Sequence, residues 1–83
     1  MNKILVEVFI PSIRETFEVY IPVDSRVSEI LTLIEQAAQE LTGGAFLPDR
    51  QVVLCERNSG MVYNINMTVE QVGLKNGSQL LIM

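Results

Sequence analysis

Hydrophobic and polar residues alternate along the first two segments of the chain. The stretches "KILVEVFIP" and "RETFEVYIP" place an apolar residue at every second position, a period typical of strands with one buried face. Only "PSI" separates the two strands, so we expect them to form a hairpin. The residues predicted to face inward are Ile4, Val6, Val8 and Ile10 in the first strand, and Phe17, Val19 and Ile21 in the second.

After the second strand the period changes. Apolar residues now recur every three or four positions, which predicts an amphipathic helix over about 26–42. Asp24 or Ser25 is expected to cap its first turn, and Gly43 and Gly44 to provide its left-handed exit. The predicted buried stripe is Val27, Ile30, Leu31, Ile34, Ala37, Ala38 and Leu41.

Shorter segments complete the chain. "AFLPDR" is predicted to be a loop, "QVVLCE" a third strand, "RNSG" a turn, and "MVYNI" a short fourth strand. "TVEQVGL" indicates one helical turn capped by Thr68, and "SQLLIM" a last strand after a loop at Asn76 and Gly77.

This order of elements predicts an α+β fold, in which one helix lies across one mixed sheet of four to five strands. In the β-grasp form of this plan the first and last strands are parallel neighbours at the centre of the sheet, and the apolar density of "ILVEVFI" and "LLIM" suits that position. The 83 residues are expected to form a single domain, 1–83. In the third strand the pattern leaves two alternatives, because its inward pair is either Val53 and Cys55 or Val52 and Leu54.

Composition and charge exclude several functions. The net charge of -4 and the scattered basic residues argue against a nucleic-acid partner. Histidine is absent and Cys55 is the single cysteine, which excludes an internal disulfide and a metal site of the usual kind and fits a reducing, cytoplasmic location. No apolar run approaches the roughly 18 to 20 residues that cross a bilayer, so we expect no membrane insertion.

The sequence offers little for catalysis. Cys55 has no histidine anywhere in the chain to activate it, so a structural thiol is the favoured interpretation. Glu29, Glu35 and Glu40 fall on the polar side of the predicted helix, where a solvated charged face is the ordinary explanation. We therefore predict that the chain is not an enzyme and needs no cofactor.

The last sixteen residues, "TVEQVGLKNGSQLLIM", resemble the ubiquitin family in their threonine cap, apolar anchor and final strand, and "LPDRQ" resembles the loop that family places before its third strand. Among prokaryotic members the chain is most similar to the YukD-like group, through its N-terminal hairpin and the closing "GLKNGSQLLIM". This resemblance implies a ubiquitin-like β-grasp fold. It also implies a protein-interaction module in the cytoplasm, an accessory of a bacterial type VII secretion system.

Members of the fold that are conjugated to proteins or carry sulfur act through a terminal Gly-Gly tail. In this chain the last predicted strand runs into Met83, and the paired Gly43 and Gly44 fall at the end of the helix. We therefore expect a non-conjugating protein. The alternatives are a sulfur-carrier or protein-tagging function, which the sequence disfavours, and a homodimerising structural subunit.

A binding face is predicted on the side of the sheet away from the helix. If Leu80 and Ile82 point to the helix, strand alternation turns Leu81 and Met83 to the other side. The resemblance places Leu81 and Met83, together with Leu54, on the surface that ubiquitin-like proteins offer to partners, and the first strand adds Leu5 and Phe9.

Scattered surface aliphatic residues without a function are the ordinary alternative to such a patch. Asp49, Arg50, Glu56 and Arg57 flank the third strand and are candidates for orienting a partner, although charges at a sheet edge usually only solvate it. The expected partner is a protein, with secretion-system components as the first candidates, and the chain itself is expected to be a monomer or a weak homodimer.

Overall fold

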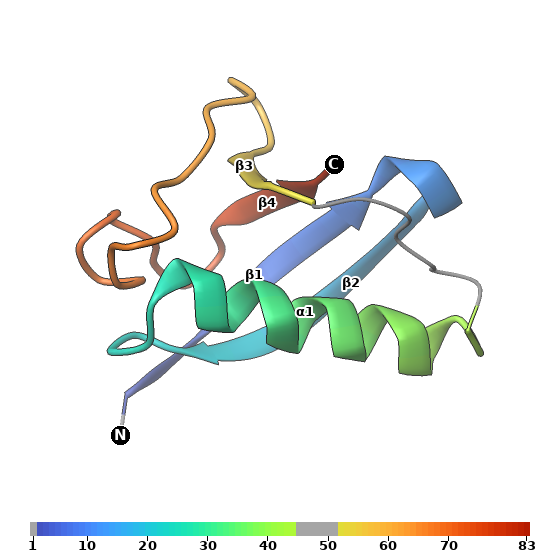
Figure 1. Ribbon diagram of the computed structural model, residues 1–83, viewed down its shortest axis with the longest axis horizontal. Helices are drawn as coiled ribbons and strands as arrows, with labels where there is room; N and C mark the ends of the chain where they lie inside the picture. The colour runs from blue at the N-terminus through green and yellow to red at the C-terminus, as the bar shows by residue number, and fades with distance from the viewer. Residues whose placement is uncertain (1, 45–51) are drawn as a thin grey trace.

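The computed structural model describes residues 2–44 and 52–83. Four strands form one sheet in the order β2-β1-β4-β3, with β1 and β4 parallel at its centre and the outer pairs antiparallel (Figure 1). This arrangement confirms the predicted α+β plan. The elements are β1 (Lys3–Ile10), a 3₁₀ helix (Pro11–Ile13), β2 (Glu15–Pro22), α1 (Val27–Leu41), β3 (Leu54–Glu56) and β4 (Gln79–Ile82).

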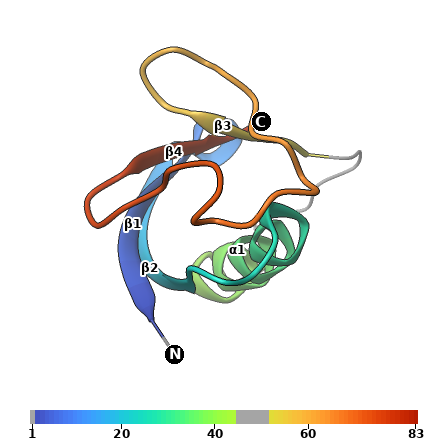
Figure 2. The same ribbon diagram turned by 90° about the vertical axis from the view of Figure 1, so that its left-hand side faces the viewer.

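The helix α1 lies against one face of the curved sheet, and the loops after β3 arch over its N-terminal end (Figure 2). Alternate residues of β1 point to this face, as the period of two predicts, and they are buried together with the apolar stripe of α1. Leu41, predicted to be part of that stripe, is instead 66 % exposed at the last turn of the helix. The side chains that are less than 2 % exposed are Val6, Val8, Ile10, Ile21, Val27, Ile30, Ile34, Ala38, Leu54, Cys55, Val69, Leu80 and Ile82.

The N-terminus of α1 is closed by backbone carbonyls of a distant loop. The N–H groups of Val27 and Ser28 donate to the carbonyls of Met67 and Ile65, at 2.9 and 3.1 Å. These bonds satisfy amides that otherwise need a side-chain cap.

The predicted cap at Asp24 or Ser25 is therefore wrong. The carboxylate of Glu29 instead accepts a hydrogen bond from the N–H of Arg26, at 3.0 Å. At the other end Gly43 and Gly44 have φ angles of +62° and +91°, which confirms the left-handed exit.

The chain after β3 forms turns rather than a full strand. In the predicted strand "MVYNI" only Val62 bridges Cys55, and the N–H of Tyr63 donates to the carbonyl of Leu54. The prediction of a strand is wrong because the chain turns away at once, through a bond from the N–H of Met67 to the carbonyl of Asn64. The loop predicted for "AFLPDR" lies outside the described residues.

The turn before β4 is set by two reciprocal bonds. The N–H of Thr68 donates to Gln71 Oε1 at 2.9 Å, and the N–H of Gln71 donates to Thr68 Oγ1 at 3.1 Å, which confirms the predicted threonine cap. The next loop then joins β1 directly. Asn76 Oδ1 accepts the Leu5 N–H, and the Gly77 N–H donates to the Leu5 carbonyl, both at 2.8 Å.

Candidate functional site on the outer sheet face

The face of the sheet turned away from α1, here called the outer face, carries an apolar row that crosses three strands. Phe9 of β1 lies opposite Leu81 of β4, Leu81 lies opposite Cys55 of β3, and Cys55 lies opposite Val62 in the following loop. We call these four residues the outer row. Phe9 and Leu81 are half-buried, and Val62 is 56 % exposed.

Met83 extends the outer row at one end. It follows Leu81 by two positions, so strand alternation places both side chains on the same face. The backbone groups of Met83 and Val53 exchange two hydrogen bonds, of 3.0 and 3.2 Å. Met83 is 52 % exposed. The structure thus brings together three of the predicted binding residues, Phe9, Leu81 and Met83.

The prediction that Leu54 belongs to this face is wrong. Leu54 is 1 % exposed and lies opposite Ile82, which faces the core. Pairing of Cys55 with Leu81 fixes this register, and a side chain one position along a strand points to the opposite face. Val52 and Leu54 are therefore the inward pair, and Val53 and Cys55 point outward.

Leu5 lies on the outer face but apart from the outer row. It is half-buried opposite Tyr20 of β2, which is 65 % exposed. Glu7 stands between Leu5 and Phe9 on the same side of β1, so the five predicted residues do not form one continuous patch.

A row of charged side chains, Glu7 and Glu18, separates the outer row from Leu5 and Tyr20. Glu7 lies directly opposite Glu18 of β2, an arrangement of like charges that is unfavourable by itself. Arg57 offsets it, because its Nη1 donates to Glu7 Oε1 at 2.7 Å. The guanidinium of Arg57 also lies 4.9 Å from the centre of the Phe9 ring, so it covers one end of the outer row.

The other predicted rim charges have different outcomes. Asp49 and Arg50 lie outside the described residues. Glu56 closes the turn after β3 by accepting the N–H groups of Asn58 and Ser59, at 2.7 and 3.0 Å. The Asn58 bond in particular lowers the pKa of the Glu56 carboxyl. Glu56 therefore has a structural contact, and Arg57 is the rim charge that reaches the outer row.

The thiol in the outer row is shielded. Cys55 is fully buried, and burial raises its pKa, which disfavours the reactive thiolate. Burial also raises the pKa of the neighbouring Tyr63, with smaller contributions from Glu56 and Cys55. In residues 2–44 and 52–83 no three acidic, cysteine or histidine side chains are grouped to hold a metal ion. The chemistry available on the outer face is apolar contact with a charged border.

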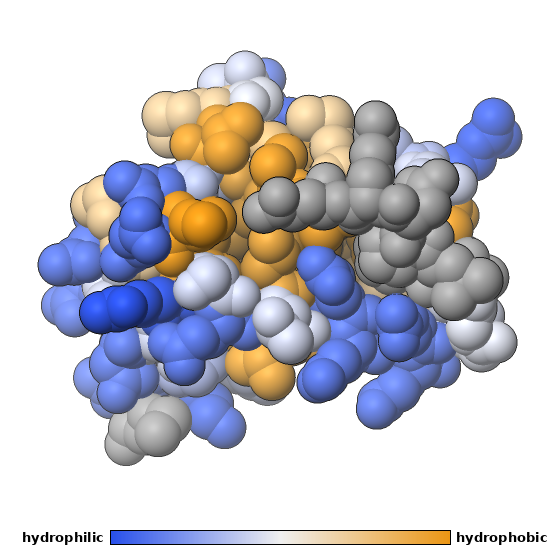
Figure 3. All heavy atoms as spheres, viewed as in Figure 1, coloured by the Kyte–Doolittle hydropathy of each residue, from blue (hydrophilic) through white to orange (hydrophobic). Residues whose placement is uncertain are grey.

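The helix-bearing side of the molecule looks different. Polar side chains cover much of α1, and hydrophobic ones gather in a band between α1 and the loop after β3 (Figure 3). The exposed apolar side chains of these two elements include Leu33 and Ile65, at 44 and 42 %. Among the described helices, none has the length and apolar character needed to cross a membrane.

Comparison with known proteins gives matches in structure only. No family model matches the sequence, and no curated protein matches it. The ubiquitin-like domain of the Mycobacterium tuberculosis type VII secretion system protein ECCD1 superposes with a TM-score of 0.78 at 13 % identity, covering 100 % of this chain and 99 % of that one.

Two further structural neighbours are chains of larger complexes. A chain of the ESX-5 inner membrane complex matches with a TM-score of 0.75 at 19 % identity, covering 100 % of this chain and 21 % of that one. A chain of a toluene 4-monooxygenase complex matches with a TM-score of 0.77 at 12 % identity, covering 98 and 96 %. The same fold thus occurs in a secretion complex and in an oxygenase complex. Together with the strand order and the single helix, these matches show that the chain has the ubiquitin-like β-grasp fold, as its closing residues predicted.

Proposed function

We propose that this chain is a ubiquitin-like interaction module of a bacterial type VII secretion system, and that it binds a protein partner in the cytoplasm. The observation that carries the proposal is the outer row with Met83, an apolar surface that crosses three strands and has a charged border. Aromatic, Met and Arg side chains are enriched in protein interfaces, and Phe9, Met83 and Arg57 provide all three.

The binding mode follows from the border. Arg57 and Glu7 are paired and half-exposed, so they remain hydrated and contribute little to affinity. They set the orientation of the partner, while contact with Leu81, Val62 and Met83 excludes water. The likeness to ECCD1 and to a chain of the ESX-5 inner membrane complex supports a secretion-system protein as the partner.

The proposed module acts without catalysis or covalent attachment. Cys55 is buried with a raised pKa, which suits a packing role rather than nucleophilic attack. Gly43 and Gly44 are used to end α1. Intact-mass analysis of the protein isolated from its native cells tests this part, since a conjugate or thiocarboxylate adds a defined mass.

The main test is a pull-down from lysate of the native organism with matched variants. The outer-face variant is Val62→Ser with Met83→Ser, and the control is Leu33→Ser with Ile65→Ser, which changes apolar residues of similar exposure on α1 and farther along the loop after β3. Circular dichroism first verifies that both are folded. We expect type VII secretion proteins to bind the wild type and the control and to be lost from the outer-face variant.

Each other outcome has a defined meaning. Equal capture of secretion proteins by the wild type and both variants would show that the outer face is not the binding surface. The proposed secretion role would then still stand. Capture without any secretion component would remove the secretion role. Light scattering distinguishes the homodimer alternative, because a dimer that the outer-face variant dissociates would assign this surface to self-association.

A further inference from the structure

A second surface, at the opposite edge of the sheet, has no role in the proposed function. The two sheet edges differ. At β3 the following loop covers the edge, because Tyr63 donates to Leu54 and Glu56 donates to Met61 through their backbones. At the other edge, formed by the eight-residue strand β2, no described residue covers the backbone in this way.

The backbone of β2 presents free groups at regular spacing. The N–H of Val23 donates to the carbonyl of Asn2, and narrow hydrogen-bonded pairs alternate along an antiparallel ladder. Odd-numbered residues of β2 therefore bond to β1. The N–H and carbonyl groups of Thr16, Glu18 and Tyr20 point away from the sheet, with no partner among the described residues.

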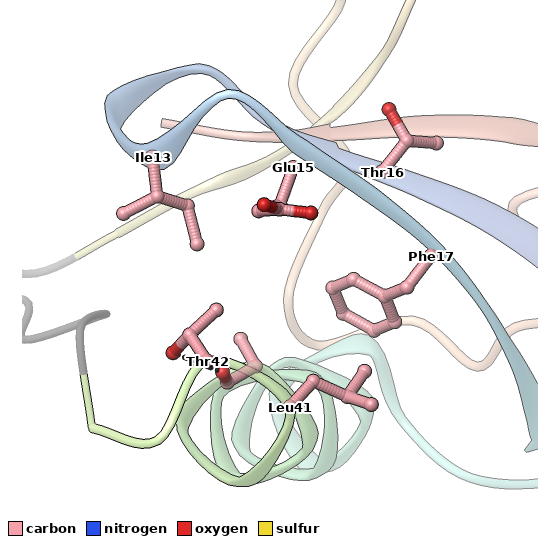
Figure 4. A pocket seen from close by; sticks show the side chains of 7 residues that line it. Ile13, Glu15, Thr16, Phe17, Leu41 and Thr42 are labelled. Atoms are coloured by element: carbon pink, nitrogen blue, oxygen red, sulfur yellow. Dashed lines mark hydrogen bonds between the residues drawn. The ribbon is translucent and has the colours of Figure 1, made fainter.

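Beside this edge lies a cavity between β2 and the last turn of α1. Its volume is about 350 Å³, within the range of natural ligand sites. Figure 4 shows Phe17 of β2 and Leu41 of α1 entering it from opposite sides, with Ile13 closing the hairpin end. Glu15 points in as well, whereas Thr16 points away. This cavity also explains why Leu41 is exposed although it belongs to the apolar stripe.

We propose that β2 binds an extended segment of a partner protein as an added strand, and that this segment alternates apolar and basic residues. A strand hydrogen-bonded to Thr16, Glu18 and Tyr20 turns every second side chain toward Phe17 and Leu41. The intervening side chains lie on the outer face beside Glu18, whose carboxylate has no described cationic partner.

The charges of β2 select a basic segment. This strand carries Glu15 and Glu18 and no basic residue. On its other side Glu18 faces Glu7, whose charge is already paired with Arg57. An incoming Lys or Arg opposite Glu18 relieves the remaining repulsion and lies beside the exposed Tyr20 ring.

The same charges argue against a second copy of the chain as the occupant. In a symmetric antiparallel pair centred on Glu18, the two copies of Glu18 lie directly opposite one another. Like charges in that position are destabilising. No lysine lies along this edge, and its proline, Pro22, stands beyond the three residues that would pair with the added strand.

The test uses two short peptides of equal length that alternate Val with Lys or Val with Glu. They share strand propensity and apolar content and differ in charge. Each is titrated into the isotopically labelled protein while backbone amide signals are recorded by NMR. We expect the Val/Lys peptide to bind at micromolar to millimolar concentration and to shift the amides of Thr16, Glu18 and Tyr20.

Two variants at one position isolate the backbone contact. Thr16→Pro removes an outward N–H without touching the ladder to β1, a place where an edge strand tolerates proline. Thr16→Ala is its control. We expect Thr16→Pro to weaken the Val/Lys peptide about tenfold, because a hydrogen bond is lost and the ring obstructs the added strand, and Thr16→Ala to bind like the wild type.

Charge reversal provides a test that leaves the backbone unchanged. Glu18→Lys should make the protein prefer the Val/Glu peptide. This variant still tests the proposal if Thr16→Pro fails to fold. Equal binding of both peptides by the wild type overturns the proposal that the bound segment is basic. Shifts confined to Phe9 and Leu81, or none at β2 with either peptide, overturn the docking site. Concentration-dependent shifts of the β2 amides without peptide assign the edge to a second copy, and also overturn it.

Discussion

Leu54, the first residue of β3, and Val53, which precedes it, provide the sharpest check on the sheet register, because the sequence left their faces open. Leu54→Ala and Val53→Ala each remove apolar carbons from adjacent positions of the chain. Leu54 is 1 % exposed and packs in the core opposite Ile82, whereas Val53 is half-buried on the outer face. The two substitutions should therefore differ strongly in the free energy of unfolding.

The size of the difference follows from burial. A buried Leu→Ala change costs about 2.7 to 5 kcal/mol, part of it for the cavity that remains. Val53 is shorter and remains in partial contact with water, so Val53→Ala should cost about 1 kcal/mol or less. A domain of 83 residues is stable by about 4 to 12 kcal/mol in total, so Leu54→Ala takes up a large share of that stability.

Urea unfolding followed by circular dichroism measures both changes, with the slope of free energy against urea as a check that the unfolded states are comparable. In thermal unfolding, Leu54→Ala should lower the midpoint by at least about 10 °C and Val53→Ala by only a few degrees. A larger cost for Val53→Ala than for Leu54→Ala would mean that Val53 and Cys55, and not Val52 and Leu54, are the inward pair. The outer row would then lose Cys55, and with it the proposed binding surface.

Three further predictions concern single groups. The thiol of Cys55 should react with an aromatic disulfide at least about 100-fold more slowly in the folded protein than in urea, since it is buried, and similar rates would contradict the packing. Folding lowers the pKa of Glu56, so its charged form stabilises the protein above the unfolded pKa and this contribution fades as pH falls through the folded pKa. Glu56→Gln should thus lower the melting temperature at pH 7 and converge with the wild type at acidic pH, and a difference unchanged by pH argues against the turn contacts. Asn76→Ala removes the acceptor of the Leu5 N–H and should cost about 1 kcal/mol in urea unfolding, with Asn58→Ala as a control in which no side-chain bond is lost.

The fold could be predicted where period and burial agree. In β1 every second residue is apolar toward the helix, and in α1 the stripe repeats every three or four positions, so each pattern permits one orientation. The central place of the first and last strands agreed with their apolar density, whereas their parallel pairing came from the β-grasp plan. These features depend on local sequence and on one general rule about buried strands.

The third strand could not be assigned in the same way. Four consecutive apolar residues, 52–55, contain no alternation, so nothing local separates Leu54 from Cys55. What decides between them is pairing with β4, a contact distant in sequence. For this reason the predicted binding site was wrong at one position, because it included Leu54 of this strand.

Other features depend on contacts that a sequence pattern does not display. Carbonyls of the loop at Ile65 and Met67 replace the expected side-chain cap of α1. The cavity beside β2 depends on how far the last turn of α1 lies from the hairpin, a matter of tertiary packing. The signal that could have indicated it is Leu41, an apolar residue at the end of a stripe, close to two glycines.

The pairing of β1 with β4 also governs how the chain reaches its structure. Leu5 and Asn76, which join the two strands, are 71 positions apart, so this contact closes a very long loop. The β1–β2 hairpin and α1 involve nearby residues and can form early, whereas the centre of the sheet is completed last. On the ribosome β1 therefore keeps an open side until β4 has been synthesised. During that interval the nascent chain exposes an apolar strand edge, and this is the stage at which aggregation competes with folding.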